Sequence, residues 1–257
     1  MELGLAGRTA LVVGSTSGLG LAIAQGLGAE RARVVLSGRR EDVAKEHAAA
    51  LPEATGVGID LTDPASVDNA VAQATSAFGE IDVLVLNSGG PTPGPAAELS
   101  PEGMAASVET LLLAQIRLVS LVLPRMRRDG WGRVLAIGSS GVQAPIPNLV
   151  RSNVARAGLA AYLKTLAGEV ARDGVTVNMI LPGRIDTDRV TALDENNARR
   201  RGIDAAAVRE QSQASIPAGR YGTPAEFADV AVFLCSERAS YVTGAQVRVD
   251  GGAISGL

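Results

Sequence analysis

The chain has 257 residues, of which 46% are hydrophobic, and a formal net charge of −3. This length fits one α/β domain, and the near-balanced charge gives no reason to expect nucleic acid as a partner. The single cysteine, Cys235, excludes an internal disulfide framework and a cysteine-rich zinc site, and the single histidine, His47, leaves a Ser-His-Asp hydrolase without support.

Strand-like apolar runs alternate with helical segments through most of the sequence. In chain order the expected elements are a strand at 8–13, a helix at 19–30, a strand at 33–37, a helix at 41–50, a strand at 55–59, a helix starting at 62–64, a strand at 81–86, a helix at 101–128, a strand at 133–137, a helix at 148–172, and strands at 175–180 and 246–249. Near-continuous apolar strands in this alternation predict a doubly wound α/β (Rossmann) fold. We expect about seven parallel strands, with helices on both faces, in one domain over residues 1–257.

A glycine-rich turn links the first strand to the first helix. Gly14, Gly18 and Gly20 permit positive φ and let the backbone come close to a ligand. The free N–H groups of the helix that follows favour an anion, such as the phosphate of a dinucleotide. The plainer interpretation is a tight strand–helix turn that binds nothing. Loops after the other strands lie at the same edge of such a sheet, where ligands bind.

Motifs along nearly the whole chain resemble the short-chain dehydrogenase/reductase family. They are the turn at 13–20, the pair at 60–61, the stretch at 86–89 with Leu86 in place of the family's first Asn, the Pro-Gly turn at 181–187, and two C-terminal stretches at 219–224 and 242–252. The resemblance implies a nicotinamide dinucleotide cofactor and an activity similar to that of the 3-oxoacyl carrier-protein reductases. The cofactor-binding residues that it implies are Gly14, Ser15, Thr16, Ser17, Gly18, Leu19, Gly20, Asp60, Leu61, Asn87, Gly89, Arg156, Pro182, Gly183, Ile185 and Thr187.

The residues after the second strand indicate the choice of cofactor. An acidic residue there would bond the adenosine ribose and repel a 2′-phosphate, but this chain has Gly38 followed by Arg39 and Arg40. A guanidinium binds phosphate through paired hydrogen bonds, and Ser17 could add a hydroxyl. We therefore expect NADP(H) to be preferred over NAD(H). The alternative is that both arginines belong to a solvated helix start.

The catalytic stretch departs from the family that it resembles. Family members polarise the substrate with a Ser and a Tyr beside a Lys, and an Asn often holds a relay water. By resemblance Ser139 is the serine, whereas Ser152 stands at the Tyr position, Arg156 at the Lys position and Leu111 at the Asn position. Ser152 and Arg156 share one helix face at i, i+4, so the expected catalytic residues are Ser139, Ser152 and Arg156.

Two residues near Ser152 in the sequence, Tyr162 and Arg151, are further candidates for this site. Tyr162 is interpreted as a packing residue, and the direction of Arg151 cannot be read from the sequence.

Two functions follow from this site. The first is an NADP(H)-dependent oxidoreductase acting on a carbonyl or alcohol, in which Ser139 and Ser152 bond the substrate oxygen. In that function Arg156 binds the nicotinamide ribose and supplies positive charge. The second is a nucleotide-binding protein without that activity: a regulatory or scaffold subunit, or a non-redox enzyme.

The segment 188–216 is where the family often has a substrate lid. Its arginines either favour an acidic substrate or acyl carrier, or form a solvated helical surface; they are Arg189, Arg199, Arg200, Arg201 and Arg209. We expect a small-molecule or acyl-thioester substrate, no bound metal and, by resemblance, a homotetramer. The N-terminus shows no charged, apolar and cleavable series, and no apolar run reaches membrane-spanning length, so we expect a cytoplasmic protein without a membrane partner.

Overall fold

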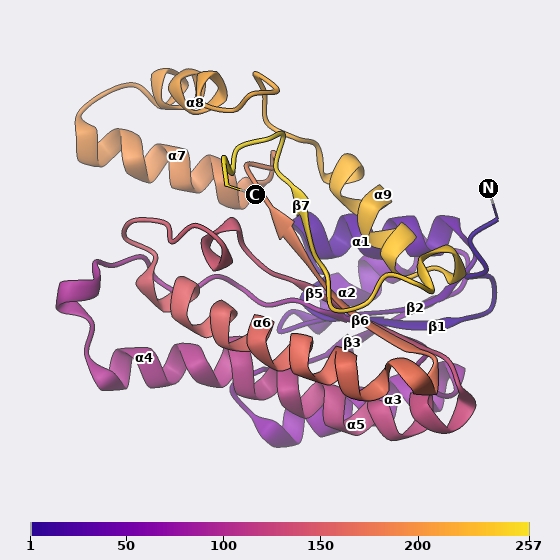
Figure 1. Ribbon diagram of the computed structural model, residues 1–257. Helices are drawn as coiled ribbons and strands as arrows, with labels where there is room; N and C mark the ends of the chain where they lie inside the picture. The colour runs from indigo at the N-terminus through magenta and orange to yellow at the C-terminus, as the bar shows by residue number, and fades with distance from the viewer. Residues whose placement is uncertain (1, 257) are drawn as a thin grey trace.

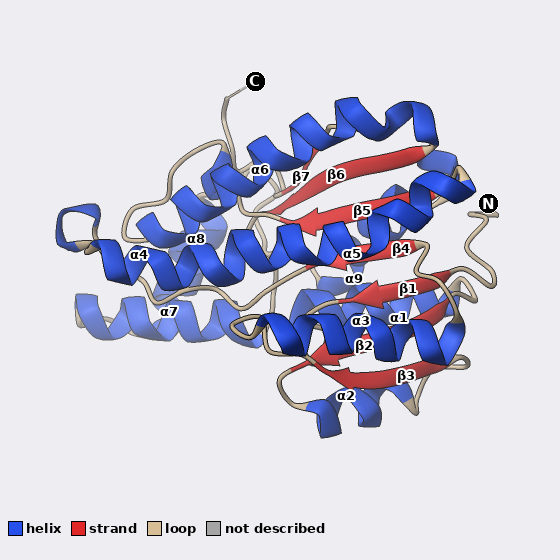
Figure 2. Ribbon diagram, turned by 90° about the horizontal axis from the view of Figure 1, so that it is seen from below, coloured by secondary structure: helices blue, strands red, loops and turns tan. Residues whose placement is uncertain are grey.

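Seven parallel strands form the centre of the computed structural model, which describes residues 2–256. In chain order the strands are β1 (Thr9–Val12), β2 (Arg33–Gly38), β3 (Ala54–Gly58), β4 (Val83–Leu86), β5 (Gly132–Ile137), β6 (Val175–Pro182) and β7 (Gln246–Val249). They are arranged in the order β3-β2-β1-β4-β5-β6-β7 (Figure 2). The predicted doubly wound parallel sheet is confirmed.

Helices cover both faces of this sheet (Figure 1). One face is packed by α1 (Gly18–Ala29), α2 (Glu41–Ala48) and α9 (Pro224–Leu234), and the other by α3 (Pro64–Phe78), α5 (Ala114–Asp129) and α6 (Val150–Val170). Each face buries its own apolar cluster against the sheet, as near-continuous apolar strands require. Single-turn 3₁₀ helices occur at Ala96–Glu98, Ser140–Val142, Ala171–Asp173 and Glu237–Ala239.

The ends of two helices show how the sequence sets their boundaries. The Asp63 side chain accepts a hydrogen bond from the Ala65 N–H at 2.9 Å, and Pro64 occupies the first helical position, so the predicted helix start is confirmed. Helix α9 begins with a capping box between Thr223 and Glu226. The sequence analysis did not predict α9, although this capping box preceded an apolar run.

The long helix expected at 101–128 is interrupted. Helix α4 (Pro101–Val108) passes through a π-helical turn at Glu109–Leu113 into α5. The stretch Pro101–Asp129 is long enough, and with a mean hydropathy of 1.6 apolar enough, to span a membrane, although no single apolar run within it does. This stretch packs against α3, α6 and the sheet, and 39% of its most apolar window is buried.

The order of the strands creates the crevice for a ligand. The chain returns from β3 to the other side of β1, where it adds β4, so the loops after β1 and β4 diverge at the carboxyl edge. Helices α7 (Asp188–Arg201) and α8 (Ala205–Ala214) extend beyond that edge above the end of β6 (Figure 1).

Candidate active site

The turn after β1 has the close backbone contacts that its glycines predict. Gly14 and Gly18 have φ values of 62° and 57°, in the left-handed region that favours glycine. A Cβ on Gly20 would lie 2.4 Å from the carbonyl oxygen of Gly14. The start of α1 therefore approaches the end of β1 as only glycine permits, and the first N–H groups of α1 face the crevice.

Ser15 holds this turn in place with its own polar groups. Its hydroxyl donates to the Val12 carbonyl at 2.8 Å and accepts from the Ser37 N–H at 2.8 Å, while its N–H donates to the Ser37 carbonyl. The side chain is fully buried. Ser15 thus binds the turn to β2, and its predicted contact with a cofactor has no free donor in this structure.

The loops after β4 and β6 meet the glycine turn. The Asn87 side-chain amide donates to the Gly14 carbonyl at 2.9 Å, and the Thr187 methyl lies 3.9 Å from the position of a Cβ on Gly18. A Cβ on Gly183 would meet the backbone of Asp250 at 2.6 Å. The structure therefore brings the end of β1 together with the loops after β4 and β6.

The predicted cofactor residues differ in their exposure. Half-buried residues at this edge are Gly14, Thr16, Gly18, Leu19, Asp60, Leu61, Asn87, Pro182, Gly183 and Thr187; exposed residues are Ser17, Arg39, Arg40 and Gly89; buried residues are Ser15, Gly20, Arg156 and Ile185.

The end of β2 presents positive charge. A Cβ on Gly38 would lie 2.7 Å from the methyl group of Thr16, so a side chain at position 38 has no room without a shift of Thr16. Arg39 and Arg40 are both exposed. Hydrogen bonds from Thr62, and then the charge of Arg39, lower the pKa of Asp60. A cation and a carboxylate thus stand beside each other at the carboxyl edge, after β2 and β3.

Ser139 follows β5 at the same edge. Its hydroxyl oxygen accepts from the Gly141 N–H at 3.1 Å, which leaves its O–H to donate elsewhere. Asn153 on α6 ties down the loop after it: its side-chain amide donates to the Ile146 carbonyl at 2.9 Å. Loop and helix are thereby fixed relative to Ser139.

Ser152 and Arg156 lie together on the buried side of α6, each 8% exposed. An Arg156 N–H donates to the Ile137 carbonyl at 2.5 Å, two residues before Ser139. Burial, and then the charge of Arg189, lowers the pKa of Arg156 to about 10, so its guanidinium stays charged near neutral pH. Within residues 2–256 the Ser152 hydroxyl has no hydrogen-bond partner. A hydroxyl and a cation are therefore available beside Ser139.

Three residues near this pair, Arg151, Tyr162 and Leu111, contact other parts of the structure. Arg151 donates to the carbonyls of Thr92 and Gly103, both at 3.2 Å, and so ties α6 to α4 and to the loop before it. Tyr162 packs against the apolar cluster of α3, α5 and α6, as predicted. Leu111 is 2% exposed in the π-helical turn and belongs to the core.

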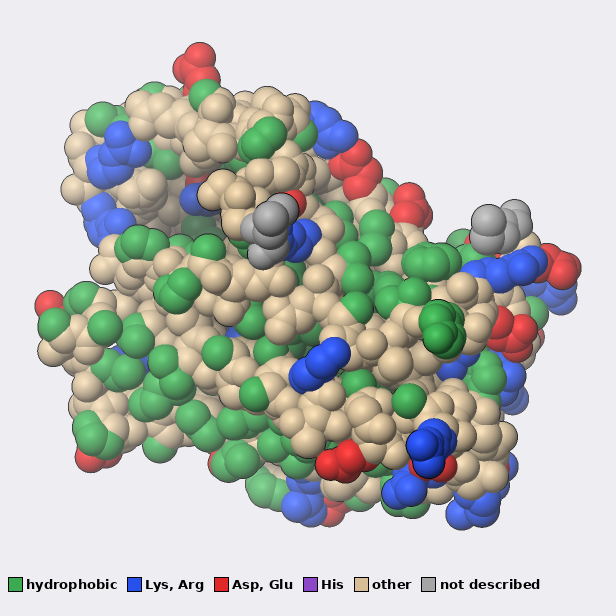
Figure 3. Space-filling model, in the orientation of Figure 1, with side chains coloured by type: hydrophobic (Ala, Val, Ile, Leu, Met, Phe, Trp, Pro, Cys, Tyr) green, Lys and Arg blue, Asp and Glu red, His purple; other side chains and the backbone are tan. Residues whose placement is uncertain are grey.

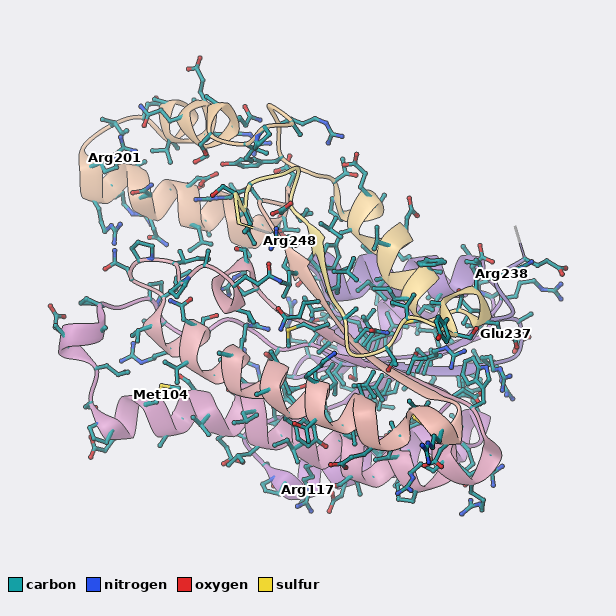
Figure 4. The ribbon with its side chains drawn as sticks, viewed as in Figure 1. Met104, Arg117, Arg201, Glu237, Arg238 and Arg248 are labelled. Carbon is teal, nitrogen blue, oxygen red and sulfur yellow. The ribbon has the colours of Figure 1, made fainter. Side chains whose placement is uncertain are left out.

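A cavity of about 570 Å³ opens beside this site. Its lining includes Ser140, Gln143, Ile146 and Arg248, and the segment 253–256 closes it. The Arg248 guanidinium donates to the Gln143 side chain and to the Gly256 carbonyl, both at 2.5 Å (Figure 4). This cavity gives room for a substrate next to the loop of Ser139.

A buried carboxylate attaches α7 to the body of the protein. Asp194 is 3% exposed and accepts from Arg184 at 2.6 Å and from the Tyr221 hydroxyl at 2.8 Å. Arg209 on α8 forms two hydrogen bonds with Asp186 and lies over the Tyr221 ring. The sequence analysis did not identify Asp194, because its partners lie in other segments.

The described residues 2–256 contain no cluster of His, Cys, Asp and Glu side chains that could hold a metal ion. Cys235 is fully buried, and burial raises the pKa of its thiol to about 12. The Cys235 thiol is therefore protonated near neutral pH.

Known proteins resemble this chain over nearly its whole length. A family model described as enoyl-(acyl carrier protein) reductase matches residues 13–253. The 3-oxoacyl-[acyl-carrier-protein] reductase of Escherichia coli strain K12 is 36% identical over 96% of this chain and 97% of its own. The D-beta-hydroxybutyrate dehydrogenase of Cupriavidus necator is 34% identical over 98% and 99%. The structure of L-sorbose reductase from Gluconobacter frateurii, complexed with NADPH and L-sorbose, has a TM-score of 0.94 at 35% identity and covers both chains fully.

Proposed function

This chain belongs to the short-chain dehydrogenase/reductase family, and on that premise we propose that it is an NADP(H)-dependent oxidoreductase that interconverts a carbonyl and an alcohol. The observation that carries the proposal is the crevice at the carboxyl edge, where the Gly14–Gly20 turn, Asn87 and Thr187 meet beside Ser139 and Arg156. A dinucleotide at the turn and a substrate at Ser139 would share this crevice. The three relatives are a reductase acting on 3-oxoacyl carrier protein, a hydroxybutyrate dehydrogenase and a sorbose reductase.

The chain's own residues fit NADP(H). Gly20 lets the start of α1 pack against the Gly14 carbonyl, which places the first N–H groups of α1 at the turn where a pyrophosphate would bind. The residue that ends β2 is Gly38, and the first acidic residue after it, Glu41, is paired with Lys45 at 2.7 Å. The exposed guanidinium of Arg39 directly follows Gly38 and could bind a 2′-phosphate. The sorbose reductase of similar fold holds NADPH. These observations support a preference for NADP(H) over NAD(H).

Three side chains, those of Ser139, Ser152 and Arg156, are available for the chemistry at the substrate. Bound NADP(H) would supply or accept the hydride. Ser139 and Ser152 are the hydroxyls available to bond the substrate oxygen, and Arg156 supplies positive charge beside them. Arg156 keeps its proton, so the proton gained by the reduced oxygen comes from water through a serine hydroxyl. Without a phenol as general acid, reduction is expected to be roughly 10²–10⁴-fold slower than with one.

We also propose the segment 188–216 as a substrate lid, since α7 and α8 extend over the crevice. Copies of the chain are expected to assemble into a homotetramer in the cytoplasm. Apolar side chains gather over α4, α5 and α6 (Figure 3), where Leu113, Leu121 and Val154 are 47%, 40% and 52% exposed. An apolar surface of this kind fits an interface between copies. Light scattering after size-exclusion chromatography measures the assembly.

A second candidate function is NADP(H) binding without this reduction. It is favoured by Ser152, Arg156 and Leu111, which occupy the positions where the family has Tyr, Lys and Asn. The functions are separated by NADPH oxidation with a panel of 3-oxoacyl thioesters, diketones, quinones and aldehydes, beside a thermal-shift titration with NADP⁺. Turnover supports the oxidoreductase; stabilisation by NADP⁺ without turnover supports the binding protein.

A double variant tests whether the rest of the site is competent. Changing Ser152→Tyr with Arg156→Lys restores a phenol and an amine, and it should speed ketone reduction. The matched control combines Ser152→Phe with Arg156→Lys, which has the same bulk without the hydroxyl. A gain in the first variant alone identifies proton donation as the missing function; equal rates in both variants contradict that assignment.

A further inference from the structure

The arginines of segment 188–216 are not equivalent in the structure. Arg209 is paired with Asp186 through two hydrogen bonds, at 2.9 and 2.6 Å. Arg199, Arg200 and Arg201 stand in the last turn of α7, where the helix dipole favours a cation. Arg201 lies at the end of α7 farthest from the sheet (Figure 4) and donates to Gln211 at 2.8 Å. Interactions within segment 188–216 and its flanking residues therefore account for these four arginines, without a ligand.

Arg189 differs from the others in position. It is the second residue of α7, where the same dipole disfavours a cation. Its guanidinium lies directly over Gly90: a Cβ on that glycine would be 1.7 Å from Nη2. Arg189, although an exposed residue, therefore reaches from the lid back to the loop after β4, where its guanidinium occupies the space that a side chain at position 90 would take. Within residues 2–256 its guanidinium has neither a hydrogen bond nor an ion pair.

Arg156 supplies a second charge at the same place. It is buried, and its one hydrogen bond goes to a neutral carbonyl, that of Ile137. The charge of Arg189 contributes to the lowered pKa of Arg156, whereas no carboxylate within the described residues offsets it. Figure 3 shows Lys and Arg atoms in the hollow beneath α7 and α8. Arg156 is thus anchored at the end of β5 and Arg189 lies over the loop after the neighbouring strand β4, and within residues 2–256 neither guanidinium has an anionic partner.

We propose that Arg156 and Arg189 together bind the carboxylate of the substrate, so that this chain acts on oxo acids or hydroxy acids rather than on neutral carbonyls. A carboxylate accepts paired hydrogen bonds from a guanidinium and would neutralise both cations. Arg156 is anchored on the Ile137 carbonyl, two residues before Ser139, so short oxo acids, in which carboxylate and carbonyl are close together, are the substrates to test. In reduction the carbonyl carbon gains a hydride from NADPH and its oxygen gains a proton from water. The inference rests on the proposed function, which supplies the NADPH.

The test measures binding as well as turnover. Oxamate, an unreactive analogue of a 2-oxo acid, and its neutral counterpart oxamide are titrated by calorimetry into wild-type protein saturated with NADP⁺. Oxamate should bind and oxamide should not. Arg189→Gln should weaken oxamate binding about tenfold or more, since a charged hydrogen-bonding partner is lost, and Arg189→Lys should restore part of it. Arg200→Gln, an exposed arginine at the other end of the same helix, is the matched control and should change nothing.

Turnover separates this inference from the proposed function. With 2-oxobutanoate and 3-oxobutanoate, Arg189→Gln should raise KM about tenfold or more, while leaving KM for the methyl esters unchanged. Equal KM values for acid and ester in the wild type, or an equal effect of Arg189→Gln and Arg200→Gln, overturn the carboxylate site but leave the oxidoreductase standing. If NADP⁺ fails to bind, or no carbonyl is turned over, the proposed function itself fails.

Discussion

Replacing Gly20 by alanine should destabilise the protein, whereas the same change at Gly168 should stabilise it. The Cβ at position 20 would meet the Gly14 carbonyl oxygen at 2.4 Å and the Asn87 amide nitrogen at 2.9 Å. Both neighbours are held by the hydrogen bond between them, so strain of about 1–3 kcal/mol adds to roughly 1 kcal/mol for the weakened bond. The sum lowers Tm by roughly 5–15 °C for a chain of this size.

Gly168 is the matched control for this change. It lies in the interior of α6, it is exposed, and a Cβ there would meet nothing within 4 Å. Alanine should therefore stabilise the helix by up to about 1 kcal/mol and raise Tm by roughly 2–4 °C. Calorimetric melts measure both variants, and titration with NADP⁺ should show weaker binding only for Gly20→Ala. The reasoning is refuted if Gly20→Ala retains wild-type Tm and NADP⁺ affinity, or if Gly168→Ala is the less stable protein.

Three further outcomes follow from single side chains. Arg39→Ala should weaken NADP⁺ binding roughly 10- to 100-fold and leave NAD⁺ binding unchanged in calorimetry, whereas equal losses for both cofactors would exclude a 2′-phosphate contact. Asp194→Ala leaves the buried Tyr221 hydroxyl without its carboxylate partner and should cost about 3 kcal/mol in urea unfolding, with faster proteolysis within 188–216; an unchanged midpoint would contradict this. Burial raises the pKa of Cys235 to about 12 from an ordinary value of 9.0, so the unfolded chain loses this proton first and stability should fall as pH rises above about 9. The decline should be shallower in Cys235→Ala, and equal slopes would rule the thiol out as its source.

The periodic parts of the fold could be predicted from the sequence. Apolar runs and cap residues indicated the seven strands and the start of α3, because their signals are local. Helix α9 was not predicted, although a capping box marks its start and Phe227 is completely buried in it. The π-helical turn inside 101–128 leaves the apolar pattern intact and so had no signal.

Site residues could be predicted from the sequence only where their contacts lie within one continuous segment, such as the turn after a strand. Gly14 and Gly20 could be read because their turn is continuous in sequence. Arg189 could be named only as one of five lid arginines, since its place over Gly90 depends on how two distant loops pack. Likewise Ser15 lies in a cofactor motif, but its hydroxyl accepts a hydrogen bond from the Ser37 N–H in β2. Spacing therefore predicted which residues stand at this edge, and packing decided which of their groups remain free.

The most direct test is single-turnover oxidation of NADPH by the wild-type protein with a panel of carbonyl substrates, run beside an NADP⁺ thermal-shift titration. The account predicts that NADP⁺ raises Tm, that at least one carbonyl in the panel is reduced, and that Ser139→Ala slows this reduction without weakening NADP⁺ binding. Stabilisation by NADP⁺ with no reduction of any carbonyl would contradict the proposed oxidoreductase.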